Sequence, residues 1–125
     1  MILVVDDDRS LRVSTVRLLA AHGYSALAAA SADAALSKAK EVLPRVILMD
    51  LHMGGMGGIE ATRRIKADPQ LCDIPVIAIS ATPPLWEESR RMFATVLTKP
   101  APSGLLIAAI EGLVREPPSN APSQQ

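Results

Sequence analysis

Five short apolar runs alternate along the chain with longer stretches that suit helices. The runs cover residues 2–5, 24–29, 46–49, 76–79 and 95–98. The first run is apolar at every position, which is typical of a strand buried on both faces of a sheet. Because helix-compatible stretches separate the runs, we predict an α/β chain in which a doubly wound parallel sheet carries helices on both faces.

Helix signals fill the stretches between the runs. A helix is expected over residues 10–22, where Gly23 ends it as a C-terminal cap does. Ser31 is the expected N-cap of a second helix, whose apolar positions recur at helical spacing. Further helices are expected after the glycine-rich residues 54–58, over residues 86–92, and at residues 106–113, which carry one apolar face.

The domain organisation is simple. A length of 125 residues suits one compact domain and is too short for two of ordinary size. Residues 117–125 are rich in Pro, Ser and Gln and carry no apolar stripe. We therefore expect one folded domain over residues 1–116 and a tail at 117–125 that is disordered or begins a linker.

The composition excludes several classes of function. Aromatic residues make up 2% of the chain, so it has almost none of the stacking platforms that usually bind single-stranded nucleic acid. Lys plus Arg equals Asp plus Glu at 13 each, so no net charge attracts nucleic acid or anionic lipid. No apolar run approaches the length of a membrane span. We expect neither direct nucleic-acid binding nor a membrane.

Two features favour a cytoplasmic location. Cys72 is the only cysteine, so no disulfide can form within the chain, which fits a reducing compartment. Met1 leads directly into an apolar run and then into three aspartates, a pattern unlike that of a signal peptide.

Polar side chains follow four of the five runs, at the point where each predicted strand ends. Because the carboxyl ends of parallel strands meet at one edge of a sheet, we expect these side chains to lie close together. They are Asp6, Asp7 and Asp8 after the first run, Asp50 after the third, Ser80 after the fourth and Lys99 after the fifth.

These residue types suit phosphoryl transfer. Carboxylates that meet at one edge repel one another unless a cation lies between them, and Mg²⁺ prefers such hard oxygen ligands. The Lys99 ammonium supplies a second positive charge, and the Ser80 hydroxyl can donate a hydrogen bond to a phosphoryl oxygen. Asp50 can then act as the nucleophile and become an aspartyl phosphate.

Four segments around these residues resemble the motifs of response-regulator receivers, the CheY-like family of two-component signalling. They are Val4-Val5-Asp6-Asp7-Asp8, Ile47-Leu48-Met49-Asp50-Leu51, Ile77-Ala78-Ile79-Ser80-Ala81 and Leu97-Thr98-Lys99-Pro100. The match runs in order from about residue 2 to residue 114, nearly the whole folded chain. The resemblance implies a five-stranded sheet in the flavodoxin-like order 2-1-3-4-5.

The resemblance also implies roles for the acidic residues. Asp50 would be the phosphoacceptor and a ligand of Mg²⁺. Asp7 would ligate the ion, and Asp6 would ligate it through water or orient it. The backbone carbonyl of His52 would be the remaining protein ligand of the ion. Asp8 is interpreted as a solvated flank or as the cap of the first helix.

Further roles follow from the same resemblance. Ser80 would be the switch hydroxyl and Lys99 the phosphate-binding lysine, with a cis bond expected between Lys99 and Pro100. The His52 imidazole and Thr82 are possible modulators of phosphoryl lifetime, and a solvent-facing role is an equally good interpretation of each. The donor would be a histidine kinase or a histidine phosphotransfer protein, and the output protein is not identified by the sequence.

Two departures from the family pattern affect these expectations. The loop Met53-Gly54-Gly55-Met56-Gly57-Gly58 has Gly where the family usually carries Pro and Asp, which predicts a more mobile loop. Val96 occupies the position, three residues before Lys99, where the family usually carries an aromatic ring. We therefore expect the signal to leave the domain by rearrangement of the backbone and of the helix at residues 86–92, without an aromatic rotamer change.

Alternative functions remain open at this stage. A degenerate receiver would act only as a protein docking module and never take phosphate. A small metal-dependent phosphatase would also form an aspartyl phosphate, but it commonly needs a second carboxylate at the position that His52 occupies. A receiver is otherwise no enzyme, because it catalyses only its own phosphoryl transfer and autodephosphorylation. Both a single-domain regulator and a part of a larger regulator or hybrid kinase fit the sequence, and we favour the first.

Overall fold

The computed structural model of the protein describes residues 1–82 and 90–115. Its centre is a parallel sheet of five strands in the order β2-β1-β3-β4-β5. The strands are β1 (Ile2–Val5), β2 (Ala26–Ala29), β3 (Val46–Asp50), β4 (Val76–Ser80) and β5 (Thr95–Thr98). The predicted fold class and strand order are therefore confirmed.

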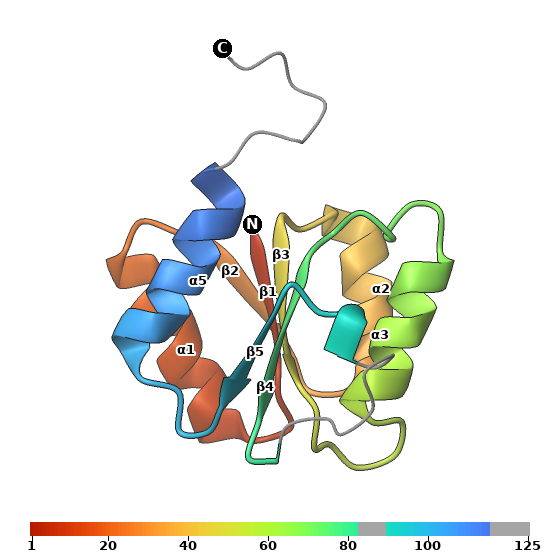
Figure 1. Cartoon of the computed structure of the whole chain (residues 1–125), viewed down its shortest axis with the longest axis horizontal. Helices are drawn as coiled ribbons and strands as arrows, with labels where there is room; N and C mark the ends of the chain where they lie inside the picture. The colour runs from red at the N-terminus through yellow and green to blue at the C-terminus, as the bar shows by residue number, and fades with distance from the viewer. Residues whose placement is uncertain (83–89, 116–125) are drawn as a thin grey trace.

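Helices cover both faces of this sheet. Helices α1 (Arg9–Ala21) and α5 (Ser103–Arg115) lie on one face, and α2 (Ala32–Val42) and α3 (Gly58–Ala67) lie on the other (Figure 1). None of these helices, within the part of the chain that the structure describes, is long and apolar enough to cross a membrane.

The element boundaries differ slightly from the expected ones. Strand β2 begins at Ala26, two residues later than expected, although the Ser25 carbonyl already accepts a hydrogen bond from the Ile2 amide at 2.8 Å. The helix expected at residues 86–92 lies mostly outside the described residues. The part that is described includes Arg90 and Arg91, which are helical. The expected tail at 117–125 also lies outside them.

Side-chain caps fix where the first two helices begin. The Asp8 carboxylate accepts a hydrogen bond from the Leu11 amide at 3.1 Å and is the N-cap of α1. The Ser31 hydroxyl accepts one from the Ala34 amide at 3.1 Å and caps α2, as predicted. Each cap satisfies an amide at a helix N-terminus that has no carbonyl partner within the helix.

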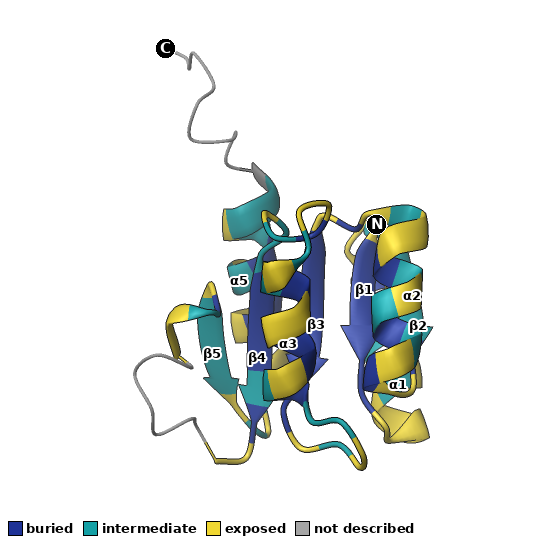
Figure 2. Ribbon diagram, turned by 90° about the vertical axis from the view of Figure 1, so that its right-hand side faces the viewer, coloured by how far each residue is buried: buried dark blue, intermediate teal, exposed yellow. Residues whose placement is uncertain are grey.

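The core consists of two apolar layers, one on each face of the sheet. Alternate residues of each strand point to opposite faces, so Leu3 and Val5 of β1 pack toward α2 and α3, while Ile2 and Val4 pack toward α1 and α5. All five residues of β3 are buried, and Figure 2 shows the central strands as the most buried elements. This double burial holds the strands in register and brings their carboxyl ends to one edge.

Leu43 adopts an unusual backbone conformation at the end of α2. Its φ of 46° and ψ of 67° lie in the left-handed region, and its side chain is 56% exposed. A side chain with a Cβ atom is strained in this region, whereas glycine is not. The position closes α2 through a hydrogen bond of 2.9 Å from the Leu43 amide to the Ala39 carbonyl.

We predict that Leu43→Gly stabilises the protein by about 1 kcal/mol, because it relieves the left-handed strain and removes little buried surface. Urea unfolding followed by circular dichroism would measure the change. The control is Leu43→Ala, which removes most of the same side chain and keeps the strain. Equal stability of the two variants would contradict the prediction.

Candidate functional site

The polar residues predicted at the strand ends meet at one edge of the sheet. Asp6 directly follows β1, and Lys99 directly follows β5. Asp50 and Ser80 are the last residues of β3 and β4, which are adjacent strands. The parallel order of the sheet therefore assembles the site from four separate segments of the chain.

Three carboxylates form the acidic part of the site. One oxygen each of Asp6, Asp7 and Asp50 can be chosen such that all three lie within 4.8 Å of one another. Asp6 and Asp50 are buried, whereas Asp7 is exposed. Three hard oxygen donors with one open side fit Mg²⁺, which keeps several of its own waters when it binds a protein. Asp8 does not join this cluster, because its carboxylate caps α1.

The crowding of carboxylates changes the acidity of Asp6. Burial raises the pKa of the Asp6 carboxyl above its usual range, and the negative charge of Asp50 raises it further. The hydrogen bond from the Asp8 amide, 2.9 Å long, and the charge of Lys99 act in the opposite direction. The pKa of Asp6 is therefore raised, because burial and the charge of Asp50 outweigh the hydrogen bond and the Lys99 ammonium.

Lys99 extends across the site between two of the carboxylates. Its Nζ atom lies 3.3 Å from Oδ1 of Asp50 and 3.7 Å from Oδ2 of Asp6. Its amide donates a hydrogen bond of 2.9 Å to the Ser80 carbonyl, and the Lys99–Pro100 peptide bond is cis, as expected. The ammonium is thus placed where an anion bound to Asp50 would meet it.

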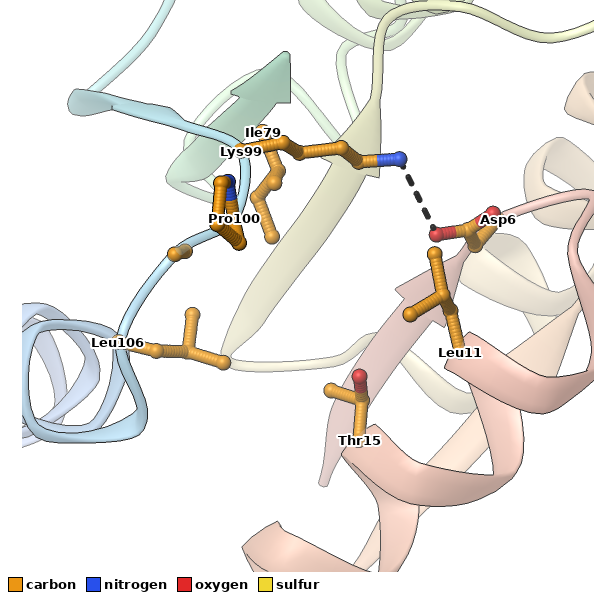
Figure 3. A pocket seen from close by; sticks show the side chains of 8 residues that line it. Asp6, Leu11, Thr15, Ile79, Lys99, Pro100 and Leu106 are labelled. Atoms are coloured by element: carbon orange, nitrogen blue, oxygen red, sulfur yellow. Dashed lines mark ion pairs between the residues drawn. The ribbon is translucent and has the colours of Figure 1, made fainter. Parts of the chain in front are cut away.

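A groove opens beside the Lys99–Asp6 ion pair. It has a volume of about 440 Å³ and lies between α1 and the segment that joins β5 to α5. Figure 3 shows Leu11 and Thr15 of α1 on one side of it, with Pro100 and Leu106 on the other. The groove leaves Lys99 and Asp6 accessible from the side of α1 and α5.

Ser80 is fully buried, and its hydroxyl has three hydrogen-bond partners. It donates to the Thr82 carbonyl and accepts from the Thr82 amide at 3.1 Å. Nε2 of His52 lies 2.9 Å from the same oxygen. Because the single hydroxyl proton is directed at the Thr82 carbonyl, the imidazole is the donor in this third bond.

The bond between His52 and Ser80 was not predicted from the sequence. His52 and Ser80 are 28 residues apart, and each was assigned to the site separately. The available signal was the position of His52, which lies just beyond the end of β3, next to the strand that ends in Ser80. The His52 amide also donates a hydrogen bond of 3.1 Å to Oδ1 of Asp50.

Gly58 brings α3 into direct contact with the backbone of the site. A Cβ atom at Gly58 would lie 2.3 Å from the Asp50 carbonyl oxygen and 2.8 Å from Cα of Leu51. Only glycine allows this approach, so the first residue of α3 determines where the Asp50 backbone lies. Gly57, the preceding residue, has ordinary space for a Cβ atom, with its nearest neighbour at 3.7 Å.

Comparisons with known proteins agree on one family. The model of the response regulator receiver domain matches residues 2–111. Protein PilH of Pseudomonas aeruginosa is 31% identical over 117 residues, which cover 90% of this chain and 96% of PilH. Response regulator PleD of Caulobacter vibrioides is 34% identical over 118 residues, which cover 91% of this chain and 26% of PleD. The chain thus spans nearly all of the first relative and about a quarter of the second.

Solved structures give the same result. The chemotaxis protein CheY4 of Vibrio cholerae matches with a TM-score of 0.81 and 25% identity, over 90% of this chain and 96% of that chain. The N-terminal domain of a response regulator receiver protein from Methanoculleus marisnigri matches with a TM-score of 0.74 and 33% identity. That match covers 93% of this chain and 97% of the other.

We predict that Gly58→Ala destabilises the protein by about 1–3 kcal/mol, because the added Cβ atom must displace the backbone of Asp50 and Leu51. Chemical unfolding would measure the loss. Gly57→Ala is the matched control, since it adds the same methyl group one residue earlier without a clash. A similar loss in both variants would show that the close approach of Gly58 to the Asp50 carbonyl does not explain the effect.

We predict that Asp6→Asn stabilises the metal-free protein by about 1 kcal/mol at neutral pH. The raised pKa of Asp6 means that its carboxyl stabilises the fold below its unfolded pKa, and that this contribution is lost as pH rises through the folded pKa. Asn keeps an oxygen that can accept from the Asp8 amide and removes the charge. The difference between variant and wild type should therefore shrink as the pH is lowered.

Unfolding with a metal chelator present, at neutral and at acidic pH, would measure this effect. Asp33→Asn is the control, because it removes an exposed carboxylate from the first turn of α2, away from the acidic cluster. Stabilisation by both variants would point to net charge as the cause.

Proposed function

The chain belongs to the response-regulator receiver family, and from this premise we propose that it accepts a phosphoryl group on Asp50 in a Mg²⁺-dependent reaction. Receiver domains work in two-component systems, together with kinases and output proteins. The donor for this chain would be a phosphorylated histidine of a kinase or of a phosphotransfer protein. Transfer would form a bond between phosphorus and an Asp50 oxygen and break the bond between phosphorus and the donor nitrogen.

The observation that carries this proposal is the placement of Asp50. Its carboxylate is 3% exposed, lies 3.3 Å from the Lys99 ammonium and belongs to a cluster with Asp6 and Asp7. A carboxylate that only stabilised the fold would need one cationic partner. Asp50 instead shares a single lysine with Asp6, so this site has excess negative charge that a cation would balance.

The surrounding residues support the chemistry in different ways. Asp6, Asp7, Asp50 and the backbone carbonyl of His52 would hold Mg²⁺, which when bound neutralises charge on the carboxylates and on the phosphoryl oxygens. Lys99 would pair with one phosphoryl oxygen. The groove beside Lys99 and Asp6 would leave room for part of the donor next to the site.

Ser80 would complete the site after transfer. Its hydroxyl would turn from the Thr82 carbonyl to donate a hydrogen bond to a phosphoryl oxygen, and this movement would change how the domain binds its partner. His52 and Thr82 would influence how long the phosphoryl group persists. We place this signalling protein in the cytoplasm, and we propose no reaction for it beyond its own phosphorylation and autodephosphorylation.

Two alternatives make different use of the same residues. A docking module that never takes phosphate needs neither the acidic cluster nor Lys99. A phosphatase of this chemistry commonly uses a second carboxylate at residue 52, and here that residue is a histidine bonded to Ser80. The arrangement of the side chains therefore supports the phosphoacceptor over both.

We predict that acetyl phosphate and Mg²⁺ together add one phosphoryl group to the protein, detected by intact mass. The adduct should be absent without Mg²⁺ and absent in Asp50→Asn, because both the cation and the nucleophile are required. Asp8→Asn is the matched control. It changes the carboxylate that follows Asp6 and Asp7 and keeps an N-cap for α1, so the variant should retain the adduct.

Two results would contradict the proposed phosphorylation of Asp50. If the wild-type protein forms no adduct and also fails to bind the phosphoryl mimic beryllofluoride with Mg²⁺, the domain is a docking module. An adduct that persists in Asp50→Asn would place phosphorylation on another residue.

A further inference from the structure

The Ser80 hydroxyl and the Asp50 carboxylate lie on opposite sides of the sheet edge. Asp50 continues the alternation of Val46 and Leu48, whose side chains face α1 and α5. Ser80 continues the alternation of Val76 and Ala78, whose side chains face α2 and α3. In this structure the hydroxyl therefore points away from the nucleophile, toward the β3–α3 loop.

His52 meets the hydroxyl on that side. Its Nε2 atom lies 2.9 Å from Oγ of Ser80, and the bond joins the ends of two neighbouring strands. Within the described residues, the Ser80 hydroxyl has one side-chain partner, His52, and its other two hydrogen bonds are with the Thr82 backbone. To donate to a phosphoryl group on Asp50, the hydroxyl must leave the Thr82 carbonyl, and it then moves away from His52.

We propose that His52 is a positioning residue that holds Ser80 in its resting orientation, so that phosphorylation must break the His52–Ser80 hydrogen bond. The proposal rests on the proposed function of Asp50 and goes beyond it, because it identifies what opposes the switch. When Ser80 turns, the imidazole loses its partner, and the change reaches the loop that His52 begins as well as the Thr82 backbone.

The surroundings of His52 suit this role. The residue is exposed, so its imidazole can exchange Ser80 for water when the bond breaks. It begins a loop that contains Gly54, Gly55 and Gly57, and Gly55 has a φ of 70°. A glycine-rich loop adapts to a new position of its first side chain at little energetic expense.

The β5 side of the site offers no comparable response. Val96 is partly buried and packs against the core layer beneath α2 and α3, and it has no polar atom that could follow the hydroxyl. His52 is a ring side chain already bonded to the hydroxyl. Among side chains, His52 therefore connects the Ser80 hydroxyl to the surface through the β3–α3 loop.

The resting bond can be tested without metal or phosphate. The Thr82 amide donates to Oγ of Ser80, so its NMR chemical shift reports on the hydroxyl that His52 holds. We expect His52→Ala to shift the Thr82 amide resonance in the metal-free protein. His52→Gln should restore the wild-type position, because its side-chain amide can donate from nearly the same place. An unchanged Thr82 amide resonance in His52→Ala would show that His52 does not hold the Ser80 hydroxyl in the resting protein.

The effect on switching can be tested by calorimetric titration with beryllofluoride in the presence of Mg²⁺. We expect His52→Ala to bind the mimic about three- to tenfold more tightly than the wild type, as loss of one hydrogen bond predicts, and His52→Gln to bind like the wild type. The same substitution in a Ser80→Ala background should have no effect, because His52 acts through the hydroxyl.

The outcomes separate this inference from the proposed function. If the wild type fails to bind beryllofluoride, both are wrong. If the wild type binds beryllofluoride and His52→Ala binds it equally or more weakly, the proposed role of Asp50 is supported. The proposal that His52 holds Ser80 in its resting orientation is then wrong. An equal gain in the presence and absence of Ser80 would show that His52 acts directly on the bound mimic.

Discussion

The site depends on like charges that the sheet forces together. Asp6 and Asp50 are buried at the ends of adjacent strands, and Asp7 joins them. Burial raises the pKa of the Asp6 carboxyl, and the negative charge of Asp50 raises it further. Lys99 is within 4 Å of two of these carboxylates and compensates part of the repulsion. The negative charge that Lys99 leaves uncompensated belongs to three carboxylates that could hold a divalent cation.

The fold can sustain this repulsion because its core fixes the strand ends. Strand β3 is buried along its whole length, and its neighbours β1 and β4 pair with it on both sides, so Asp50 cannot retreat toward solvent. Gly58 further restricts the position of the Asp50 backbone, since α3 begins in van der Waals contact with the Asp50 carbonyl. The apolar layers thus provide the energy that holds an electrostatically unfavourable site in place.

Much of this arrangement is predictable, because strand ends are marked by a change from apolar to polar residues. That change predicts Asp6, Asp50, Ser80 and Lys99 at one edge of the sheet, and residue type and spacing predict Ser31 as a helix cap. Contacts between residues far apart in the sequence cannot be predicted in this way. The His52–Ser80 bond, for example, depends on side-chain orientation at two strand ends. The left-handed Leu43 was also missed, because its residue type gives no warning of a positive φ.

Two departures from the family pattern lie on either side of Ser80. Val96 removes a ring from β5, and the glycine-rich loop removes rigidity beyond β3; considered separately, both weaken the machinery that transmits a signal. The His52–Ser80 bond connects them, because it gives the hydroxyl a ring partner on the β3 side, at the start of the loop that glycine makes adaptable. A rigid loop would hold His52 against Ser80 and oppose the switch, so the loss of proline and the presence of histidine are physically consistent with each other.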